Sequence, residues 1–222
     1  MFKPLLAASV LTISAFGWMQ DWTQDRSPVV PLEGGKMIIE WAPGKEAVVR
    51  ISAENEEDLE RVRILRPDGQ ELVRLDAGPS GCLAGLELEL RAPDLGQLLE
   101  DYVDGRYAIR ASTSRGKRLQ GQVDLSLDLP AAPRIVHPRF GQIVEGSNLR
   151  LMWLADSSAA GYEVQLEQGE DDGLRVRLPP QRSSFQVPRD FLAPGKPTTL
   201  EVIAIGANGN RTVSEVLFVT RP

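Results

Sequence analysis

The two residue types with the widest chemical range, histidine and cysteine, each occur once, as His137 and Cys82. A Cys/His metal cage, a Cys–His dyad and a disulfide framework all need more of these residues. His137 precedes the rigid Pro138, and we expect a plain residue at a strand edge or between domains. Cys82 is expected to be a small buried hydrophobe, with an intermolecular disulfide as the alternative. The sequence therefore predicts no catalytic residue and no cofactor.

Two groups of carboxylates are the remaining candidates for chemistry. The first group precedes a predicted strand and is expected to fan into solvent: Glu54, Glu56, Glu57, Asp58 and Glu60. The second occupies a predicted hairpin tip: Glu170, Asp171 and Asp172. Either group could bind calcium only if its loop gathered the oxygens around one point. We expect no metal site, calcium included.

Composition favours a folded, turn-rich β protein. The chain has 222 residues, 42% of them hydrophobic, with 20 Gly and 16 Pro. This length suits two domains of roughly 100 residues each. The formal net charge is −6, and Lys and Arg are scattered instead of forming a stripe. Nucleic acid is therefore not an expected partner.

Residues 1–17 have the order of a secretory signal peptide. Lys3 precedes an uncharged run from Leu5 to Phe16, and the small residues Ala15 and Gly17 would precede cleavage before Trp18. The alternative is an uncleaved anchor, but the run is shorter than the roughly 20 residues that span a bilayer. We predict export to the periplasm or beyond, with no stable membrane span once the signal is cleaved.

Residues 18–35 are expected to form a flexible lead-in. This segment is polar, contains Pro28 and Pro31, and lacks a sustained period. Trp18 and Trp22 are our candidate partner-binding residues, because large aromatic side chains are favoured at interfaces. The alternatives are packing back on the first domain, or disorder. Trp41 and Phe140 are further aromatic residues that could be displayed.

Short apolar runs separated by turn residues predict a β-sandwich over residues 36–129, a Pro-rich linker at 130–133 and a second sandwich over 134–222. Arg66-Pro67-Asp68-Gly69 predicts a hairpin turn. The apolar spacing from Leu95 to Tyr102 predicts a short helix capped by Asp94. The linker is expected to limit bending between the domains.

Alternation in the second domain places Leu149, Leu151 and Trp153 on one inward face. Trp153 is therefore a predicted core residue. Asn210-Arg211-Thr212 matches a glycosylation acceptor, but its position favours a turn, where Asn and Gly accept positive φ.

Several segments of the second domain occur in the order found in fibronectin type III domains: Leu151-Met152-Trp153, Tyr162-Glu163-Val164, Leu192-Ala193-Pro194-Gly195, and Leu200 to Ile205 followed by Asn208-Gly209-Asn210. Residues 134–222 resemble this family. The tyrosine that usually follows the Leu-x-Pro-Gly element is replaced by Thr198, so that corner is expected to be looser.

The first domain is similar, more loosely, to an immunoglobulin-like sandwich through Val62 to Gly69 and Asp104 to Ile109. The whole chain resembles exported bacterial proteins that contain fibronectin type III domains. This resemblance implies a scaffold and a location and brings no catalytic residues.

The predicted fold class is all-β, with two tandem β-sandwiches, immunoglobulin-like and then fibronectin type III-like. The leading functional hypothesis is a non-catalytic exported interaction or scaffold protein that binds another envelope or extracellular protein. The alternative is a carbohydrate-binding accessory module, which would need a planar row of exposed aromatics. Only 6% of residues are aromatic.

Overall fold

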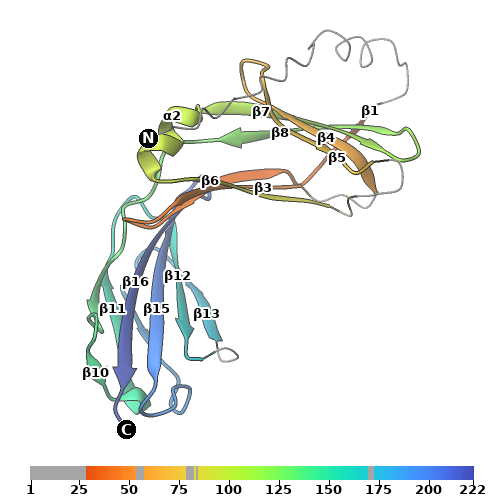
Figure 1. Cartoon of the computed structure of the whole chain (residues 1–222). Coiled ribbons are helices and arrows are strands. Elements are labelled where there is room, and N and C mark those ends of the chain that lie inside the picture. Colours follow the sequence, from red (N-terminus) through yellow and green to blue (C-terminus); the bar gives the residue numbers. More distant parts are fainter. Residues whose placement is uncertain (1–28, 54–57, 79–82, 84, 170–172) are drawn as a thin grey trace, which may run out of the picture.

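The computed structural model describes residues 29–53, 58–78, 83, 85–169 and 173–222. These residues form an almost entirely β structure, which confirms the predicted fold class. Two β-sandwich modules meet end to side at a bend, with the C-terminus at the far end of the second (Figure 1). Each module has its own core of buried apolar side chains.

The first module has two facing sheets, in the orders β1-β8-β7-β4-β5 and β2-β3-β6. Its elements are β1 (Val29–Pro31), β2 (Lys36–Trp41), β3 (Ala47–Ala53), β4 (Leu59–Leu65), β5 (Glu71–Asp76), β6 (Leu86–Ala92), α2 (Leu95–Asp101), β7 (Gly105–Thr113) and β8 (Arg118–Leu125).

The second module pairs a sheet β14-β11-β9 with a sheet β13-β12-β15-β16, and β10 adds to β16. Its elements are β9 (Arg134–His137), β10 (Ile143–Val144), a 3-10 turn (Gly146–Asn148), β11 (Arg150–Leu154), β12 (Gly161–Glu167), β13 (Gly173–Leu178), β14 (Ser184–Gln186), β15 (Pro197–Ile205) and β16 (Arg211–Thr220).

The two modules have the same strand order. In both, the first, second and fifth principal strands form one sheet, and the third, fourth, sixth and seventh form the other. A short strand runs parallel to the last strand of each module, β1 on β8 and β10 on β16. This three-against-four arrangement fits a fibronectin type III-like sandwich. The distinction that the sequence suggested between the two modules is not visible in their strand order.

Local sequence signals act as predicted in the first module. Gly69 has a φ of 85°, which closes the hairpin between β4 and β5. The Asp94 carboxylate accepts a hydrogen bond from the Gln97 amide at 2.9 Å and so caps α2. At the start of β7, the Tyr107 hydroxyl donates to the carbonyl of Val103, which precedes the strand, at 3.1 Å and fixes the chain at a corner typical of these sandwiches.

The corner of the second module is not loose, contrary to the expectation from Thr198. Thr198 is buried, and its hydroxyl accepts a hydrogen bond from the Gln168 amide at 2.8 Å. The same Gln168 amide donates to the Ala193 carbonyl, and its oxygen accepts from the Ala193 amide at 2.6 Å. A buried glutamine therefore takes the place of the tyrosine.

The predicted lead-in is wrong at its end, because Val29–Pro31 form a strand. This strand pairs with β8, and Leu32 behind it is buried in the first core. Three residues are too few to show a period in the sequence, and Pro31 made a strand an unexpected assignment. At the other end of the module, β8 stops at Leu125 instead of Leu129, because the following carbonyls turn toward the second module.

Candidate functional site

A single sheet runs through the bend between the modules. Arg211 and Thr212 at the start of β16 pair in parallel with Glu40 and Trp41 at the end of β2. The continuous strand order is β13-β12-β15-β16-β2-β3-β6. The edge of β2 is thus used at this point for joining the two modules.

Asn210 is the central hydrogen-bonding residue of this junction. Its side-chain oxygen accepts from the Ile39 amide at 2.8 Å, and its amide nitrogen donates to the carbonyls of Ser126 and Asp128, each at 2.7 Å. Asn210 is only 1% exposed. The turn assigned to this segment is confirmed by Gly209, whose φ is 87°, but Asn210 itself acts through its side chain.

The second module holds the linker and the residue Asp128 just before it. The Thr212 hydroxyl donates to the Pro130 carbonyl at 2.7 Å, and the Ala131 amide donates to the Ser158 hydroxyl at 2.9 Å. Asn208 adds a bond to the Asp128 carbonyl. The angle between the modules is therefore set by contacts on several sides, and the stiffness of the prolines is a smaller part of the explanation.

A groove of about 550 Å³ lies on the inner side of the bend, lined from both modules. Its apolar lining includes Ile38, Val48 and Ile203, which are buried although they belong to neither sandwich core. All three point away from their own core, because their strand neighbours point into it. The groove thus has an apolar floor of its own.

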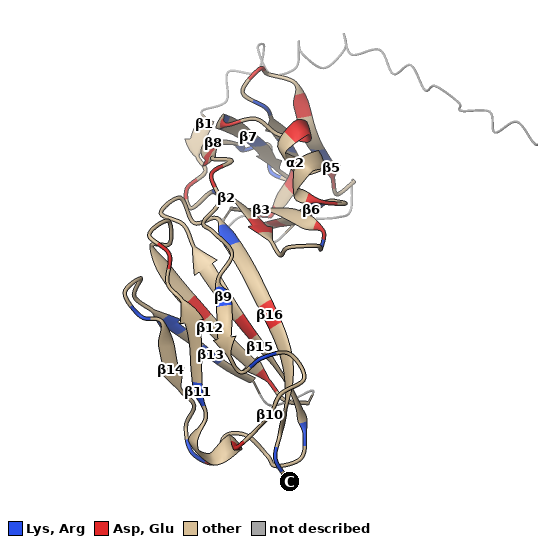
Figure 2. Cartoon of the chain, turned by 90° about the vertical axis from the view of Figure 1, so that its left-hand side faces the viewer, with Lys and Arg blue, Asp and Glu red and all other residues tan. Residues whose placement is uncertain are grey.

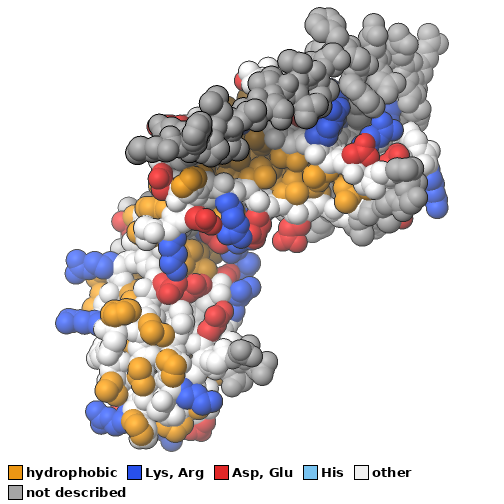
Figure 3. Space-filling model, in the orientation of Figure 1, with side chains coloured by type: hydrophobic (Ala, Val, Ile, Leu, Met, Phe, Trp, Pro, Cys, Tyr) orange, Lys and Arg blue, Asp and Glu red, His pale blue; other side chains and the backbone are white. Residues whose placement is uncertain are grey.

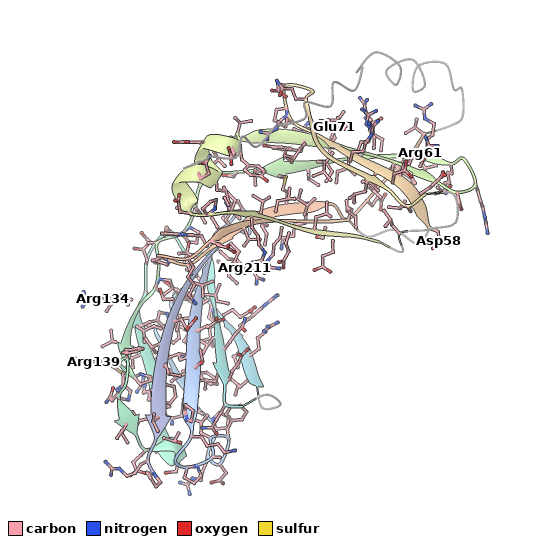
Figure 4. The ribbon with its side chains drawn as sticks, in the orientation of Figure 1. Asp58, Arg61, Glu71, Arg134, Arg139 and Arg211 are labelled. Carbon is pink, nitrogen blue, oxygen red and sulfur yellow. The ribbon has the colours of Figure 1, made fainter. Side chains whose placement is uncertain are left out.

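Charged side chains of both signs gather around this floor (Figure 3). Arg50 contacts Glu40 at 3.0 Å and also pairs with Glu89. Between the modules, Lys45 pairs with Glu215 at 2.5 Å, and Arg211 lies 3.7 Å from Glu40. Figure 4 places Arg211 where the two modules meet. The Nε atom of Arg211 is buried and has no hydrogen-bond partner among the described residues.

Beside the groove, Glu163 is a buried carboxylate, which the sequence presented only as part of the Tyr162-Glu163-Val164 segment. Its side chain is 1% exposed and pairs with Arg177 at 3.0 Å and Arg175 at 3.5 Å. Burial alone would raise the pKa of Glu163, but hydrogen bonds from Arg177 and Gln165, with the charges of Arg211 and Arg175, hold it below its usual value. Glu163 therefore stays ionised and orients two exposed arginines.

The pKa of Glu201 is shifted in the opposite direction to that of Glu163. Glu201 lies directly across from Glu215 in the β15–β16 pairing and lines the groove. Burial raises the pKa of Glu201, and the charges of Glu215 and Glu167 raise it further, while Lys45 opposes them. Glu201 is the described carboxylate of the groove with the clearest tendency to hold a proton.

We expect Glu201→Gln to stabilise the protein at neutral pH by roughly 0.2–1 kcal/mol, because it removes a like-charge cross-strand pair. A raised pKa in the folded state means that the ionised group costs stability above that pKa and costs none below the unfolded value. The gain should therefore vanish below about pH 4. Urea unfolding at pH 7.5 and pH 3.5 measures it, and an equal gain at both pH values would contradict the electrostatic explanation.

The structure separates the residues that the sequence put forward. Trp18, Trp22, Cys82, the 170–172 carboxylates and three of the first acidic group (Glu54, Glu56 and Glu57) lie outside the described residues. Trp41 is half-buried against the first core, whereas Phe140 is 79% exposed. His137 is half-buried on β9 and lines a shallow hollow beside Phe140.

Within the described ranges, no group of three or more His, Cys, Asp or Glu side chains is placed to hold a metal ion. Across the same residues, no helix has both the length and the apolar character to cross a membrane.

No family model and no curated protein matches this chain. Among solved structures, it is similar to the fibronectin(III)-like modules of Clostridium thermocellum CbhA, with 10% identity, a TM-score of 0.35, and coverage of 86% of this chain and 93% of that one. A segment of two fibronectin type III domains from chicken tenascin has 12% identity, a TM-score of 0.32 and coverage of 82% and 97%. The chicken CNTN1 FN1-FN3 domains have 16% identity and a TM-score of 0.31, with coverage of 87% of this chain and 66% of that one.

Proposed function

We propose that this chain is a non-catalytic exported scaffold protein that binds another envelope or extracellular protein in the groove at the bend. The observation that carries the proposal is that both modules build the groove and that the junction fixes their angle. Because residues of both modules line the groove, the binding surface exists only when the two modules are held together. Neither sandwich would have this surface alone.

The chemistry of the groove suits a protein segment. Ile38, Val48 and Ile203 offer an apolar floor, and the surrounding carboxylates and guanidinium groups offer both acceptors and donors. Protein interfaces commonly combine an apolar centre with a polar rim. The outer strands of the continuous sheet, β13 and β6, add free backbone groups at its two ends.

The test is recovery of partners from solubilised envelope with immobilised protein. We expect a stoichiometric protein complex, which Arg175→Glu weakens by about tenfold because it reverses a charge at the groove wall. Arg106→Glu is the matched control, since Arg106 is 65% exposed against 68% for Arg175 and does not line the groove. Retention by polysaccharide instead would favour the carbohydrate-binding alternative, and a protein recovered alone would contradict the proposal.

Export is the second part of the proposal. It is supported by the order of Lys3, the apolar run and the small residues Ala15 and Gly17. Amino-terminal sequencing of envelope material should find a chain that begins at Trp18. A chain that still begins at Met1 in a membrane fraction would favour the uncleaved anchor.

Trp18 and Trp22 are proposed to strengthen binding to the same partner. Replacing both with alanine should reduce complex recovery and leave the melting temperature nearly unchanged, because they lie in a segment that lacks a periodic apolar pattern. His137→Ala should change neither quantity. A lower melting temperature with normal recovery would instead assign the tryptophans to the first core.

A further inference from the structure

Exposed large hydrophobic side chains gather on the outer side of the bend, in two groups with opposite charge. The first group, which we call the basic face, lies on the second module. In the β9–β11 pairing, Met152 lies opposite His137 and Leu154 opposite Arg134. Phe140 and Arg139 line a shallow hollow with Met152. Met152, Leu154 and Phe140 are all exposed.

The charge of the basic face is not neutralised by the residues that the structure describes. Arg134 and Arg139 form no ion pair among the described residues. Figure 4 shows both on the outer side of the second module, directed away from it. This face therefore combines apolar anchors with two guanidinium groups that can pair with carboxylates from outside.

The second group, which we call the acidic corner, lies at α2 in the first module. Leu99 and Val103 are 40% and 48% exposed, in contrast to the buried Leu98 on the same helix. Four exposed carboxylates lie on α2 or next to it in the sequence: Asp94, Glu100, Asp101 and Asp104. One guanidinium, that of Arg66, also reaches this corner and lies over the Tyr102 ring. The acidic corner thus carries the same kind of anchors as the basic face with the opposite charge.

The formal net charge also differs between the two modules. Residues 29–133 contain 13 Lys and Arg against 19 Asp and Glu, whereas residues 134–222 contain 10 of each. The first module therefore has a formal net charge of 13 − 19 = −6 and the second is neutral, so the first modules of two copies repel one another, whereas a first and a second module do not. An arrangement that brings a first module onto a second module is therefore favoured over one that stacks two first modules.

The two patches lie on the same side of one chain, since α2 and the β9–β11 sheet both face the viewer in Figure 2. We propose that the occupant of the basic face is the acidic corner of a second copy, in an antiparallel dimer with two-fold symmetry. The two-fold axis makes each contact occur twice, so two small patches add up to one interface. This proposal does not depend on the groove, which lies on the inner side of the bend.

Charge reversal tests the proposal in the full chain. Arg134→Glu with Arg139→Glu reverses the basic face, and Glu100→Lys with Asp101→Lys reverses the acidic corner. Lysines near the end of α2 are compatible with the helix dipole. Sedimentation equilibrium from about 1 to about 500 μM should show a monomer–dimer equilibrium that either double variant weakens by at least about tenfold.

Mixing the two variants is the decisive measurement. In the mixed dimer both contacts again pair opposite charges, so a 1:1 heterodimer should form within about threefold of the wild-type affinity. Phe140→Ser should weaken all of these dimers, and Arg61→Glu, at the end of the first module away from the bend in Figure 4, should leave them unchanged. A wild-type chain that stays monomeric, variants that dimerise normally, a mixture that fails to associate, or association that continues beyond two chains would each overturn the proposal.

Discussion

Trp153→Ala is expected to lower the free energy of unfolding by about 3–5 kcal/mol, the usual cost of truncating a large buried aromatic side chain. Trp153 is 2% exposed and lies 5.6 Å from the ring of Tyr162, between centroids. Because its Nε1 atom has no hydrogen-bond partner among the described residues, the effect comes from packing and cavity formation. Urea unfolding monitored by circular dichroism measures it.

Two substitutions sharpen that prediction. Leu154→Ala changes the next residue on the same strand, which is 50% exposed, and should cost less than about 1 kcal/mol. Trp153→Phe should cost less than the alanine variant, because the phenyl ring fills more of the space that the indole leaves and neither variant gives up a hydrogen bond. Equal losses at positions 153 and 154 would mean that the alternation of β11 does not decide which side chains are buried.

Asn210→Ala should lower the free energy of unfolding by roughly 2–4 kcal/mol, because it leaves buried backbone groups without partners. The Ile39 amide and the carbonyls of Ser126 and Asp128 each lose a bond of 2.7 or 2.8 Å. These bonds join the modules, so we expect calorimetry to show one unfolding transition for the wild-type chain and two for the variant.

The matched control is Asn148→Ala in the same module. Asn148 is exposed, and its side-chain oxygen accepts only a 3.3 Å bond from Gln186 among the described residues. Its replacement should cost less than about 0.5 kcal/mol and leave the shape of the transition unchanged. If Asn210→Ala unfolds in one transition with wild-type stability, the junction does not couple the modules.

Much of each sandwich could be predicted, because strand alternation and turn chemistry are local. The alternation of apolar and polar residues along a strand was enough to predict that Leu149, Leu151 and Trp153 lie in the core. The residue preferences of helix caps and hairpin turns were enough to predict the roles of Asp94 and Gly69. Such signals are contained in a few consecutive residues, so they do not depend on which other strand lies alongside.

The junction could not be predicted in the same way, because it pairs residues about 170 positions apart. A signal was nevertheless present in Met37-Ile38-Ile39 and Val202-Ile203-Ala204, where three consecutive apolar residues break the alternation. Consecutive apolar residues indicate a strand that is covered on both faces. Glu163 gave no signal of this kind, since a buried carboxylate depends on arginines supplied by the neighbouring strand.

The pairing of β2 with β16 also affects the order in which the chain can fold during its synthesis. β2 is made early and β16 last, and ribosomes add about 5–20 residues per second. For about 10–30 s of synthesis, the edge of β2 and the Ile39 amide have no partner from β16. The first module is therefore synthesised before β16, the strand that covers part of the edge of β2. Truncations that remove β16 should expose an edge open to aggregation.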